Sequence, residues 1–452
     1  MSLELPPDEM RRLGSTAVDL VVAHLEGLRD LPPLRVVDPD QLAPLASPPP
    51  EEPGDAVAEL EAVFATALAS GSQVAHPRQF ARVPGPSNYV AAVAQLAAAG
   101  VNAFGASWLS GSGATALELA VLDWMRGWLG LPEGSEGVLT TGGSLGHLTA
   151  FAAAASDRDV DRSNATAYVS DETHATVGRA WRVLGFDPAH LRVVPGDERQ
   201  RLPVEAVAAA VAADRTAGLV PFAIVATSGT TSTGAVDPLP ELADLAAAGE
   251  LWLHVDGAYG APAALCEAGR AALAGIERAD SVVLDPHKWL FQPYELGAVL
   301  VRRPGVLERA FGLDGAYLRD VTVGEVQMRD RGLELSRGAR ALGLWLSLRV
   351  FGVRAFREAV AHGIALAEHA ERLLRSRPGW DVVSPAQLAI VCFAPADGDV
   401  DELLARTIAD GYAAPSSTVV NGRVALRLCT INPRTTLDEI EATILRLEQL
   451  RA

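Results

Sequence analysis

The chain has few cysteines, few aromatic residues and a large excess of acidic over basic side chains. Three cysteines in 452 residues, all in apolar surroundings, argue against a disulfide framework and indicate a reducing, cytoplasmic compartment. The formal net charge of −18 argues against nucleic acid or an anionic membrane as a partner, because neither attracts an acidic chain. Apolar runs are short and alanine-rich, so we expect no membrane span.

Two further features are missing. The N-terminal region carries acidic residues and no basic segment followed by an apolar one, so we expect no signal peptide. The nine histidines show no HExxH or comparable ligand spacing, so we predict no metal site. The 49% apolar and 21% charged residues are typical of a soluble globular enzyme. A chain of this length is expected to form two or three domains.

Segments with strand and helix patterns alternate from about residue 76. We expect helices at 114–129, 203–213 and 238–248, and strands at 166–170, 220–226, 251–255, 281–284 and 297–301. This alternation predicts an α/β fold with a mainly parallel sheet covered by helices on both faces. Beyond it we expect a long helix at 337–376, strands near 387–393 and 424–429, and a final helix near 436–451.

The first 75 residues differ in pattern from the rest. Apolar residues at helical spacing predict an amphipathic helix over residues 9–28. A proline-rich connector follows over residues 31–53, and proline at this density excludes helix and central strand. We therefore predict an N-terminal helical arm over 1–75, a large domain over 76–345 and a small C-terminal α/β domain over 346–452.

Lys288 follows the apolar run Val282–Leu284. Its amine is therefore expected to project from a strand end into a site rather than into bulk water. A lysine in that position can form a Schiff base with an aldehyde, provided that burial and neighbouring groups lower its pKa. Taken alone, Lys288 is better explained as an ordinary solvated surface residue, because most lysines are.

Asp256 ends the strand-like run Leu251–Val255, and ligands bind at such ends in open α/β sheets. A buried carboxylate there needs a cationic or hydrogen-bonding partner. The protonated pyridine nitrogen of pyridoxal phosphate would serve, and that pairing makes the cofactor an electron sink. The small residues Gly257 and Ala258 would let a flat ring lie against the backbone. The alternative is an aspartate that caps the next helix.

Two more segments end at the same predicted sheet edge. Residues 137–147 run from a strand through the pair Gly142-Gly143 into a helix, and free N–H groups there, with the Ser144 hydroxyl, form a seat for phosphate. The segment lacks the GxxxxGK[ST] and GxGxxG patterns of nucleotide sites. His174 follows the strand-like run Tyr168–Ser170; its imidazole can stack on an aromatic cofactor, although a lone histidine is often structural.

In this order the four segments resemble the fold-type I pyridoxal-phosphate enzymes, and among them the group II amino-acid decarboxylases typified by aromatic-L-amino-acid decarboxylase. The resemblance covers nearly the whole chain. Other matching segments are His76–Phe80, Pro84–Tyr89, Thr115–Glu118, Thr227–Gly234, Leu426–Cys429 and Asn432–Thr436. It implies an aspartate-aminotransferase-like fold and a homodimer with shared active sites.

The resemblance also implies where the cofactor, pyridoxal 5'-phosphate, is held. Lys288 would carry it as an imine, Asp256 would pair with the pyridine nitrogen, and His174 would stack on the ring. Ala258 would lie against the opposite ring face. Thr227 would border the ring and help to fix Asp256 or His174.

The same resemblance places the cofactor phosphate at Gly143, Ser144 and Asp285, with His287 between phosphate and substrate. Lys288, Asp256, His174 and His287 would be the catalytic residues. The substrate is expected to meet Arg82, Pro84, Gly85, Phe104 and Trp108. Arg82 occupies a position where aromatic-substrate decarboxylases tend to carry an aromatic side chain, so its guanidinium could bind a polar or anionic substrate group. Alternatively, Arg82 is a surface residue or forms an intersubunit salt bridge.

The resemblance implies decarboxylation of an L-amino acid, or of an intermediate derived from one, through an external aldimine and a quinonoid. Decarboxylases of this family usually present a loop tyrosine as the proton donor or its relay. The matching stretch, residues 320–335, contains no tyrosine, and Met328 or Arg331 falls near the expected position. His287 or a water could donate the proton instead.

Two alternatives keep the fold and the cofactor. One is decarboxylation coupled to oxidative deamination, which gives an aldehyde. The other is β-elimination on a cysteine S-conjugate, in secondary metabolism such as lincosamide-type antibiotic biosynthesis. A non-catalytic regulatory protein that binds pyridoxal phosphate is disfavoured, because Lys288, Asp256 and His174 are all present and no DNA-binding appendage is visible.

Overall fold

The computed structural model describes residues 3–313 and 325–451. Its large domain is built on a seven-stranded sheet with the strand order β3-β9-β8-β7-β6-β4-β5. The strands are β3 (Glu136–Thr140), β4 (Ala165–Ser170), β5 (Leu191–Val194), β6 (Val220–Thr227), β7 (Trp252–Asp256), β8 (Ser281–Leu284) and β9 (Gly297–Val301). Only β9 runs antiparallel to its neighbours, β3 and β8. The prediction of a mainly parallel α/β sheet is confirmed.

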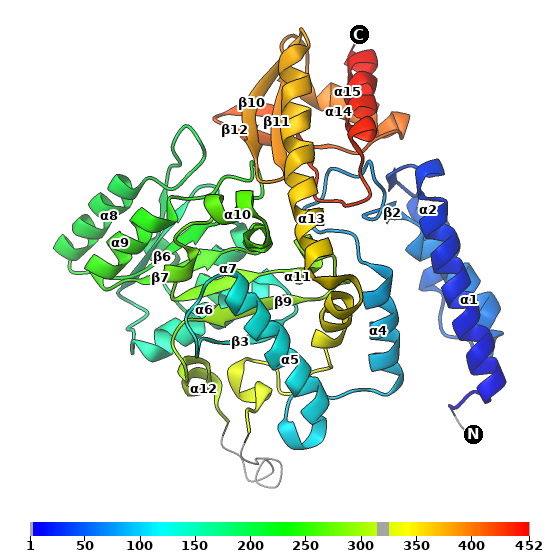
Figure 1. The fold of residues 1–452 in the computed structure, drawn as a ribbon, viewed down its shortest axis with the longest axis horizontal. Coiled ribbons are helices and arrows are strands. Elements are labelled where there is room, and N and C mark those ends of the chain that lie inside the picture. Colours follow the sequence, from blue (N-terminus) through cyan, green and yellow to red (C-terminus); the bar gives the residue numbers. More distant parts are fainter. Residues whose placement is uncertain (1–2, 314–324, 452) are drawn as a thin grey trace.

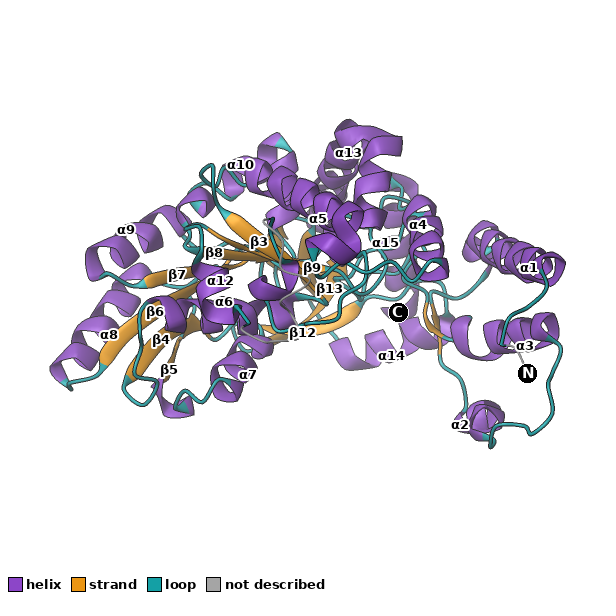
Figure 2. Cartoon of the chain, turned by 90° about the horizontal axis from the view of Figure 1, so that it is seen from below, coloured by secondary structure: helices purple, strands orange, loops and turns teal. Residues whose placement is uncertain are grey.

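Helices cover both faces of this sheet, which explains why the central strands are continuous apolar runs. Figure 2 shows α6, α7 and α12 on one face and α5, α9 and α10 on the other. The helices of this domain are α5 (Trp108–Trp128), α6 (Gly143–Asp157), α7 (Ala175–Val183), α8 (Val204–Thr216), α9 (Leu239–Gly249), α10 (Glu267–Ala272), α11 (Pro286–Trp289) and α12 (Val306–Phe311). α5 begins six residues before the expected start because an extra turn precedes a break at Gly111, whose φ is −157° and ψ 46°.

The small domain is a four-stranded antiparallel sheet with the order β10-β11-β13-β12. It consists of β10 (Trp380–Gln387), β11 (Ile390–Pro395), β12 (Ser416–Val420), β13 (Arg423–Cys429), α14 (Val400–Asp410) and α15 (Leu437–Arg451). The two central strands, β11 and β13, were expected from their apolar runs. The edge strands β10 and β12 were not, because edge strands are only partly buried and their apolar pattern is weak.

One long helix, α13 (Ala341–Ser376), joins the two domains. Figure 1 shows it rising from the large domain into the small one. Its helical backbone is interrupted at Gly352, where φ is 75° and ψ is 153°. The domain boundary expected between residues 345 and 346 falls inside the first part of this helix.

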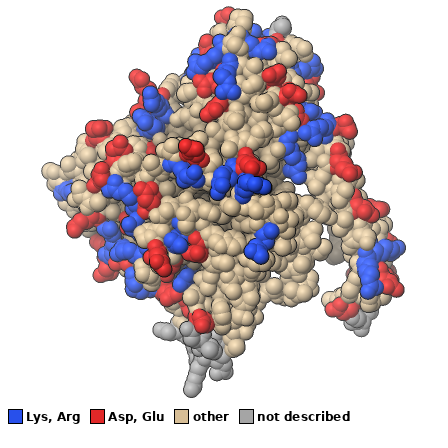
Figure 3. Space-filling view, in the orientation of Figure 1, with Lys and Arg blue, Asp and Glu red and all other residues tan. Residues whose placement is uncertain are grey.

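The N-terminal arm contains α1 (Pro7–Glu26), β1 (Leu34–Arg35), α2 (Pro39–Leu42), α3 (Ala56–Val63) and β2 (Gly71–Ser72), and α4 (Tyr89–Gly100) follows it. None of the residues of α1 is buried, and the arm stands apart from the body in Figures 1 and 3. The expectation that the proline-rich connector excludes helix is wrong for α2. Pro39 lies in the first turn of α2, where its missing N–H is not needed, and the Asp38 carboxylate caps the helix by accepting from the N–H of Asp40.

No helix within residues 3–313 and 325–451 combines the length and the apolar character that crossing a membrane requires.

Candidate active site

A cavity of about 490 Å³ opens where β6, β7 and β8 end and α6 begins. Most of the predicted site residues lie around it, although they come from segments far apart in the sequence. The predicted residues that line it are Arg82, Pro84, Gly143, Ser144, His174, Thr227, Asp256, Ala258, Asp285, His287 and Lys288. The strand-end rule therefore located the cavity correctly, while the individual roles of these residues stay predictions.

Lys288 lies in α11, directly after β8. Its amine is 3.0 Å from the Asp285 carboxylate, and its side chain is 19% exposed, so the amine is within the cavity and accessible from it. The segment around Gly85 packs closely behind α11. A Cβ atom on Gly85 would lie 2.1 Å from the carbonyl oxygen of Lys288, and the N–H of Gly85 donates to the carbonyl of His287. Glycine is thus required at position 85 by this close approach.

Lys288 is also the one lysine of the chain, since every other residue among its 38 lysines and arginines is an arginine. A guanidinium stays protonated in proteins and is a poor nucleophile, whereas a lysine amine can be deprotonated when its surroundings change. The only side-chain amine therefore lies in the cavity.

The carboxylate of Asp256 is buried at the end of β7 and held from two sides. One oxygen accepts from the N–H of Ala258 at 3.1 Å, and the other lies 3.5 Å from Nε2 of His147. Burial disfavours the charged form, but the neighbouring His147 ring, the Lys288 amine and the Ala258 hydrogen bond outweigh it, so the pKa of Asp256 is below its ordinary value. Asp256 is therefore an anion at neutral pH, suited to a cationic partner.

Two glycines at the start of α6 form a narrow cradle. Gly142 has a φ of 150°, which other residues avoid, and a Cβ atom there would lie 3.1 Å from the His287 ring. A Cβ atom on Gly143 would lie 3.2 Å from the Asp285 carboxylate and 3.3 Å from Cβ of Ala258. Because the first N–H groups of a helix have no partner within it, this cradle can bind an anion such as a phosphate.

Two histidines at the cavity are fixed in orientation by neighbouring groups. Nδ1 of His174 lies 2.7 Å from the Thr176 hydroxyl and also accepts from the N–H of Thr176. Nδ1 of His287 accepts from the N–H of Leu296 at 3.2 Å, which leaves the proton of the neutral ring on Nε2, 3.6 Å from Asp285. Burial lowers the pKa of His287, although Asp285 opposes this, so His287 is neutral at pH 7.

The residues present fit pyridoxal phosphate. The glycine cradle accepts a phosphate, Asp256 faces the cavity as an anion, and Lys288 supplies an amine. Two buried oxygens at the cavity, Oγ1 of Thr227 and Oδ1 of Asp285, have no hydrogen-bond partner among the described residues, as expected where a polar ligand completes the site.

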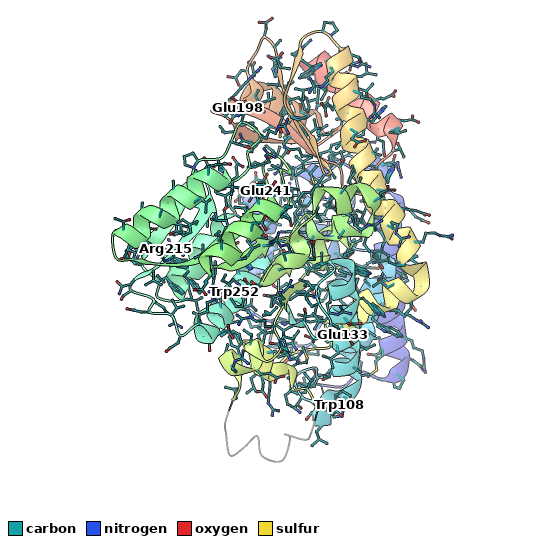
Figure 4. The ribbon with its side chains drawn as sticks, turned by 60° about the vertical axis from the view of Figure 1, so that its left-hand side comes forward. Trp108, Glu133, Glu198, Arg215, Glu241 and Trp252 are labelled. Atoms are coloured by element: carbon teal, nitrogen blue, oxygen red, sulfur yellow. The ribbon has the colours of Figure 1, made fainter. Side chains whose placement is uncertain are left out.

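Three predicted substrate residues do not line this cavity. Gly85 lies behind Lys288, as described above. Phe104 is 37% exposed and pairs with Gly338, and Trp108 lies at the lower end of α5, near the edge of the molecule (Figure 4). In one copy of the chain, Phe104 is therefore exposed and Trp108 is partly exposed, away from the cavity.

The stretch expected to carry the loop tyrosine is described from residue 325 onward; residues 320–324 lie outside the described residues. Met328 is fully buried in the core. Arg331 binds Glu308, with 3.1 Å between Nη2 and Oε1. Within one copy of the chain, neither residue is among the described residues that line the cavity.

The cavity also contains charged residues that the sequence analysis did not single out: Glu172, Glu295 and Arg427. Burial raises the pKa of Glu172, while the Ser232 hydroxyl opposes the shift. Arg427 donates to the carbonyl of Ala81 at 2.6 Å. Glu172 belongs to the segment that ends at His174, and Arg427 belongs to a segment matched by the resemblance. The sequence could have indicated Glu172 and Arg427 as cavity residues through their positions in these recognised segments.

A larger cavity of about 1020 Å³ lies at the opposite edge of the sheet, where the parallel strands begin. It contains none of the predicted residues. Its arginines bind protein groups: Arg215 donates to the Gly249 carbonyl at 2.8 Å, and Arg278 donates to the Asp244 carboxylate at 2.6 Å. We therefore assign the chemistry to the smaller cavity.

A parallel sheet that ends in a lysine amine, a buried carboxylate and a glycine-lined helix start defines a fold-type I pyridoxal-phosphate enzyme. The family model described as the pyridoxal-dependent decarboxylase conserved domain matches residues 39–395. The chain is 42% identical to an aromatic-L-amino-acid decarboxylase of Bacillus atrophaeus, over 99% of this chain and 97% of that one. It belongs to the pyridoxal-dependent decarboxylase family and is a pyridoxal-phosphate-dependent carboxy-lyase.

Three other relatives illustrate the activities for which members of this family are named. A phenylacetaldehyde synthase of Arabidopsis thaliana is 30% identical over 94% of this chain and 92% of its own length. The crystal structure of Oryza sativa TDC with PLP and tryptamine has a TM-score of 0.93 at 28% identity, covering 100% of this chain and 99% of that one. A similar fold, with a TM-score of 0.90 at 26% identity, is found in the crystal structure of Rhodiola rosea 4-hydroxyphenylacetaldehyde synthase.

Proposed function

We propose that this enzyme decarboxylates an aromatic L-amino acid to the corresponding amine. The observation that carries the proposal is the placement of the Lys288 amine and the Asp256 carboxylate at one cavity beside the glycine cradle. The 42% identity to an aromatic-L-amino-acid decarboxylase supports the choice of substrate class. Bound pyridoxal phosphate supplies an electron sink for the electrons left when CO2 departs.

The roles that we assign to the side chains follow from their geometry. Asp256, an anion at neutral pH, keeps a proton on the ring nitrogen of the cofactor. Gly142 and Gly143 leave room for its phosphate at the start of α6. His287 is neutral and carries its proton on Nε2 within the cavity, so it is positioned to deliver a proton to the substrate carbon. Asp285 pairs with the free Lys288 amine at 3.0 Å and holds it at the cavity.

A second candidate is aldehyde formation with uptake of oxygen and release of ammonia. Two observations on the chain favour this reaction. Residues 320–335 contain no tyrosine, and Met328, near the expected position, is buried in the core. The similarity to a phenylacetaldehyde synthase shows that the family includes proteins named for this product.

We also propose that the enzyme is a cytoplasmic homodimer whose partner copy completes each substrate site. Three buried free cysteines agree with a reducing compartment. α4, the start of α5 and the break in α13 expose large apolar side chains, and Figure 3 shows few charged groups on this part of the surface. The most exposed are Leu96 (60%), Val101 (77%), Leu109 (58%), Val350 (57%) and Phe351 (48%).

An exposed apolar area of this kind marks a protein interface. Phe104, between α4 and α5, and Trp108, the first residue of α5, lie next to it, so a second copy would bring them towards the cavity of its partner. Leu96→Glu is expected to give monomers with little activity by light scattering and turnover, whereas Leu445→Glu, an exposed control on α15, should stay dimeric. A dimeric Leu96→Glu enzyme would contradict the proposed interface.

The reaction is tested by incubating the enzyme with single amino acids and S-substituted cysteines while following CO2, ammonia and oxygen. Amine and CO2 in equal amounts from tyrosine, tryptophan or phenylalanine, without oxygen uptake, are the expected result. Aldehyde, ammonia and oxygen consumption would support the second candidate. CO2 release from none of the aromatic amino acids would overturn the proposed substrate class.

A further inference from the structure

A row of buried polar side chains runs from Asp256 into the core of the large domain. Nε2 of His147, on α6, lies 3.5 Å from Asp256, and its Nδ1 lies 3.0 Å from Nε2 of His254. Nδ1 of His254 lies 2.8 Å from the hydroxyl of Ser281. The indole N–H of Trp252 donates to that hydroxyl at 2.8 Å. Each of these five residues is at most 6% exposed.

The direction of the hydrogen bonds is set by the two ends of the row. The indole of Trp252 can only donate and an ionised Asp256 can only accept. Because Ser281 accepts from Trp252, its own proton is free to be donated to Nδ1 of His254. The proton of His254 then lies on Nε2 and is donated to Nδ1 of His147.

It follows that His147 carries its own proton on Nε2, facing Asp256. The opposite direction would place a nitrogen lone pair of a neutral His147 against the carboxylate. That arrangement would be acceptable only if His147 carried two protons. Burial lowers the pKa of His147, against the attraction of Asp256, and burial lowers the pKa of His254 to about 3. Both rings are therefore neutral, and the row has one consistent direction.

The row leaves Asp256 with a fixed orientation. His147 and the N–H of Ala258 bind the two carboxylate oxygens from the protein side, and Asp256 itself lines the cavity. A hydrogen bond to the charged form of a carboxylate makes it a weaker base. Without it, the carboxylate would compete more strongly for a proton shared with a ligand in the cavity.

We propose that His147, oriented by Trp252, Ser281 and His254, is a positioning residue that donates to Asp256 and keeps the shared proton on the cofactor's ring nitrogen rather than on the carboxylate. This inference rests on the proposed function, because it concerns the same site. It adds four residues to the determinants of the reaction: His147, which lines the cavity beside Asp256, and Trp252, His254 and Ser281, which do not line it. His147 acts through Asp256 and is not itself a catalytic residue.

The first test needs no cofactor. The apoenzyme is labelled with 15N-histidine, and the protonated nitrogen of each ring is identified by long-range proton–nitrogen NMR, with His147→Phe and His254→Gln used for assignment. Both His147 and His254 are expected to carry a single proton, on Nε2. A proton on Nδ1 of either ring, or a doubly protonated His147 at pH 7, would overturn the inference.

The second test uses the holoenzyme and compares replacements that keep or remove the donor. His147→Phe preserves a flat ring but cannot donate, and His147→Gln places an amide N–H near the position of Nε2. We expect His147→Phe to lower kcat about tenfold, equivalent to one pKa unit on the shared proton, with KM changed less than twofold. It should also shift the pH at which the absorption of the bound cofactor changes. His147→Gln should restore most of the wild-type kcat and most of the wild-type pH dependence of the absorption.

A control separates this effect from the loss of any buried histidine. His76 is equally buried but does not line the cavity, so His76→Gln should leave kcat and the cofactor spectrum unchanged. Equal kcat and spectra for wild type and His147→Phe would overturn the inference while leaving the proposed function intact. If the wild type releases no CO2, the proposed function fails, and the NMR result still decides the direction of the row.

Discussion

The guanidinium of Arg337 lies 2.7 Å from the carboxylate of Glu118, and both side chains are at most 2% exposed. Glu118 also accepts from the N–H of Leu139 at 2.8 Å, and Arg337 donates to the carbonyl of Leu139 at 2.7 Å. This pair therefore fastens the segment before α13 to both α5 and β3.

Removal of either charge alone should be costly, because the other charge stays buried without compensation. We predict that Arg337→Met lowers the free energy of unfolding by about 3–5 kcal/mol, measured by urea denaturation of the apoenzyme. The double variant Glu118→Leu/Arg337→Met should be more stable than Arg337→Met. If the double variant is instead less stable than Arg337→Met by the full loss of stability that Glu118→Leu causes alone, the two charges are not coupled.

Lys288→Ala should abolish covalent attachment of the cofactor. In the wild type, borohydride treatment after cofactor addition is expected to label one peptide, the one containing Lys288, because no other side chain of the chain is an amine. Peptide mass spectrometry reads the result. Labelled peptides lacking Lys288, apart from the N-terminal one, would contradict the assignment.

Neutralising Asp256 should affect turnover much more than cofactor retention. We predict that Asp256→Asn lowers kcat by about two orders of magnitude or more, the usual effect of removing one preorganised electrostatic contact at a reacting centre. Cofactor content is measured by absorbance after desalting. Retained turnover in Asp256→Asn would remove the anion from the proposed chemistry.

The buried His76 should make the fold sensitive to mild acid. Burial, together with Arg78 and Arg29, lowers the pKa of His76 to about 4, against about 6.5 in the unfolded chain. Between these values the unfolded state binds more protons, so this contribution to stability is present above pH 6.5 and is lost as the pH falls towards 4.

Wild type should therefore lose more stability than His76→Gln between pH 6.5 and 4.5, by at most about 1.4 kcal/mol per pH unit, as measured by urea denaturation. Comparing the two proteins is necessary because Asp237 acts in the opposite sense. Burial raises the pKa of Asp237 to about 7, so its protonation favours the folded state as the pH falls. Parallel pH profiles for the two proteins would contradict the prediction.

Gly352 should tolerate no side chain, although the space around it is open. A Cβ atom at Gly352 would meet nothing within 4 Å, but its φ of 75° with ψ of 153° is accessible almost only to glycine. We predict that Gly352→Ala costs about 1–3 kcal/mol in thermal or urea unfolding. Gly127→Ala, in helical backbone with equally open space, should stabilise the protein by up to about 1 kcal/mol.

The sequence predicted the location of the cavity because parallel strands buried on both faces are continuous apolar runs, and each motif follows one of them. Asp256 and Lys288 could be assigned to the same edge on that basis alone. Partly exposed edge strands such as β12 carry no such signal. The division into domains at residues 75 and 345 stays a prediction, and the break at Gly352 is a feature that apolar periodicity does not reveal.

The row behind Asp256 could not be predicted, because contact between His147 and His254 depends on how α6 packs on β7. Both residues stand inside motifs that were recognised, yet nothing in the local pattern gives their hydrogen-bond direction. The substrate roles predicted for Phe104 and Trp108 would require the second copy of the chain that we propose. One signal in the sequence was available and unused. Because the chain has a single lysine, Lys288 is not one of many surface lysines, and a functional role for it could have been predicted from this count.

The presence of a single lysine has a practical consequence. Aldehydes and acylating reagents modify primary amines indiscriminately, and most proteins therefore accumulate a mixture of adducts over their outer surface. Here the guanidinium groups on the outside resist such reagents, and the only lysine lines the cavity in which the cofactor would be held. A simple gain in whole-protein mass after acylation, corrected for the chain's first residue, would thus count vacant sites directly and follow their occupation without any chromophore.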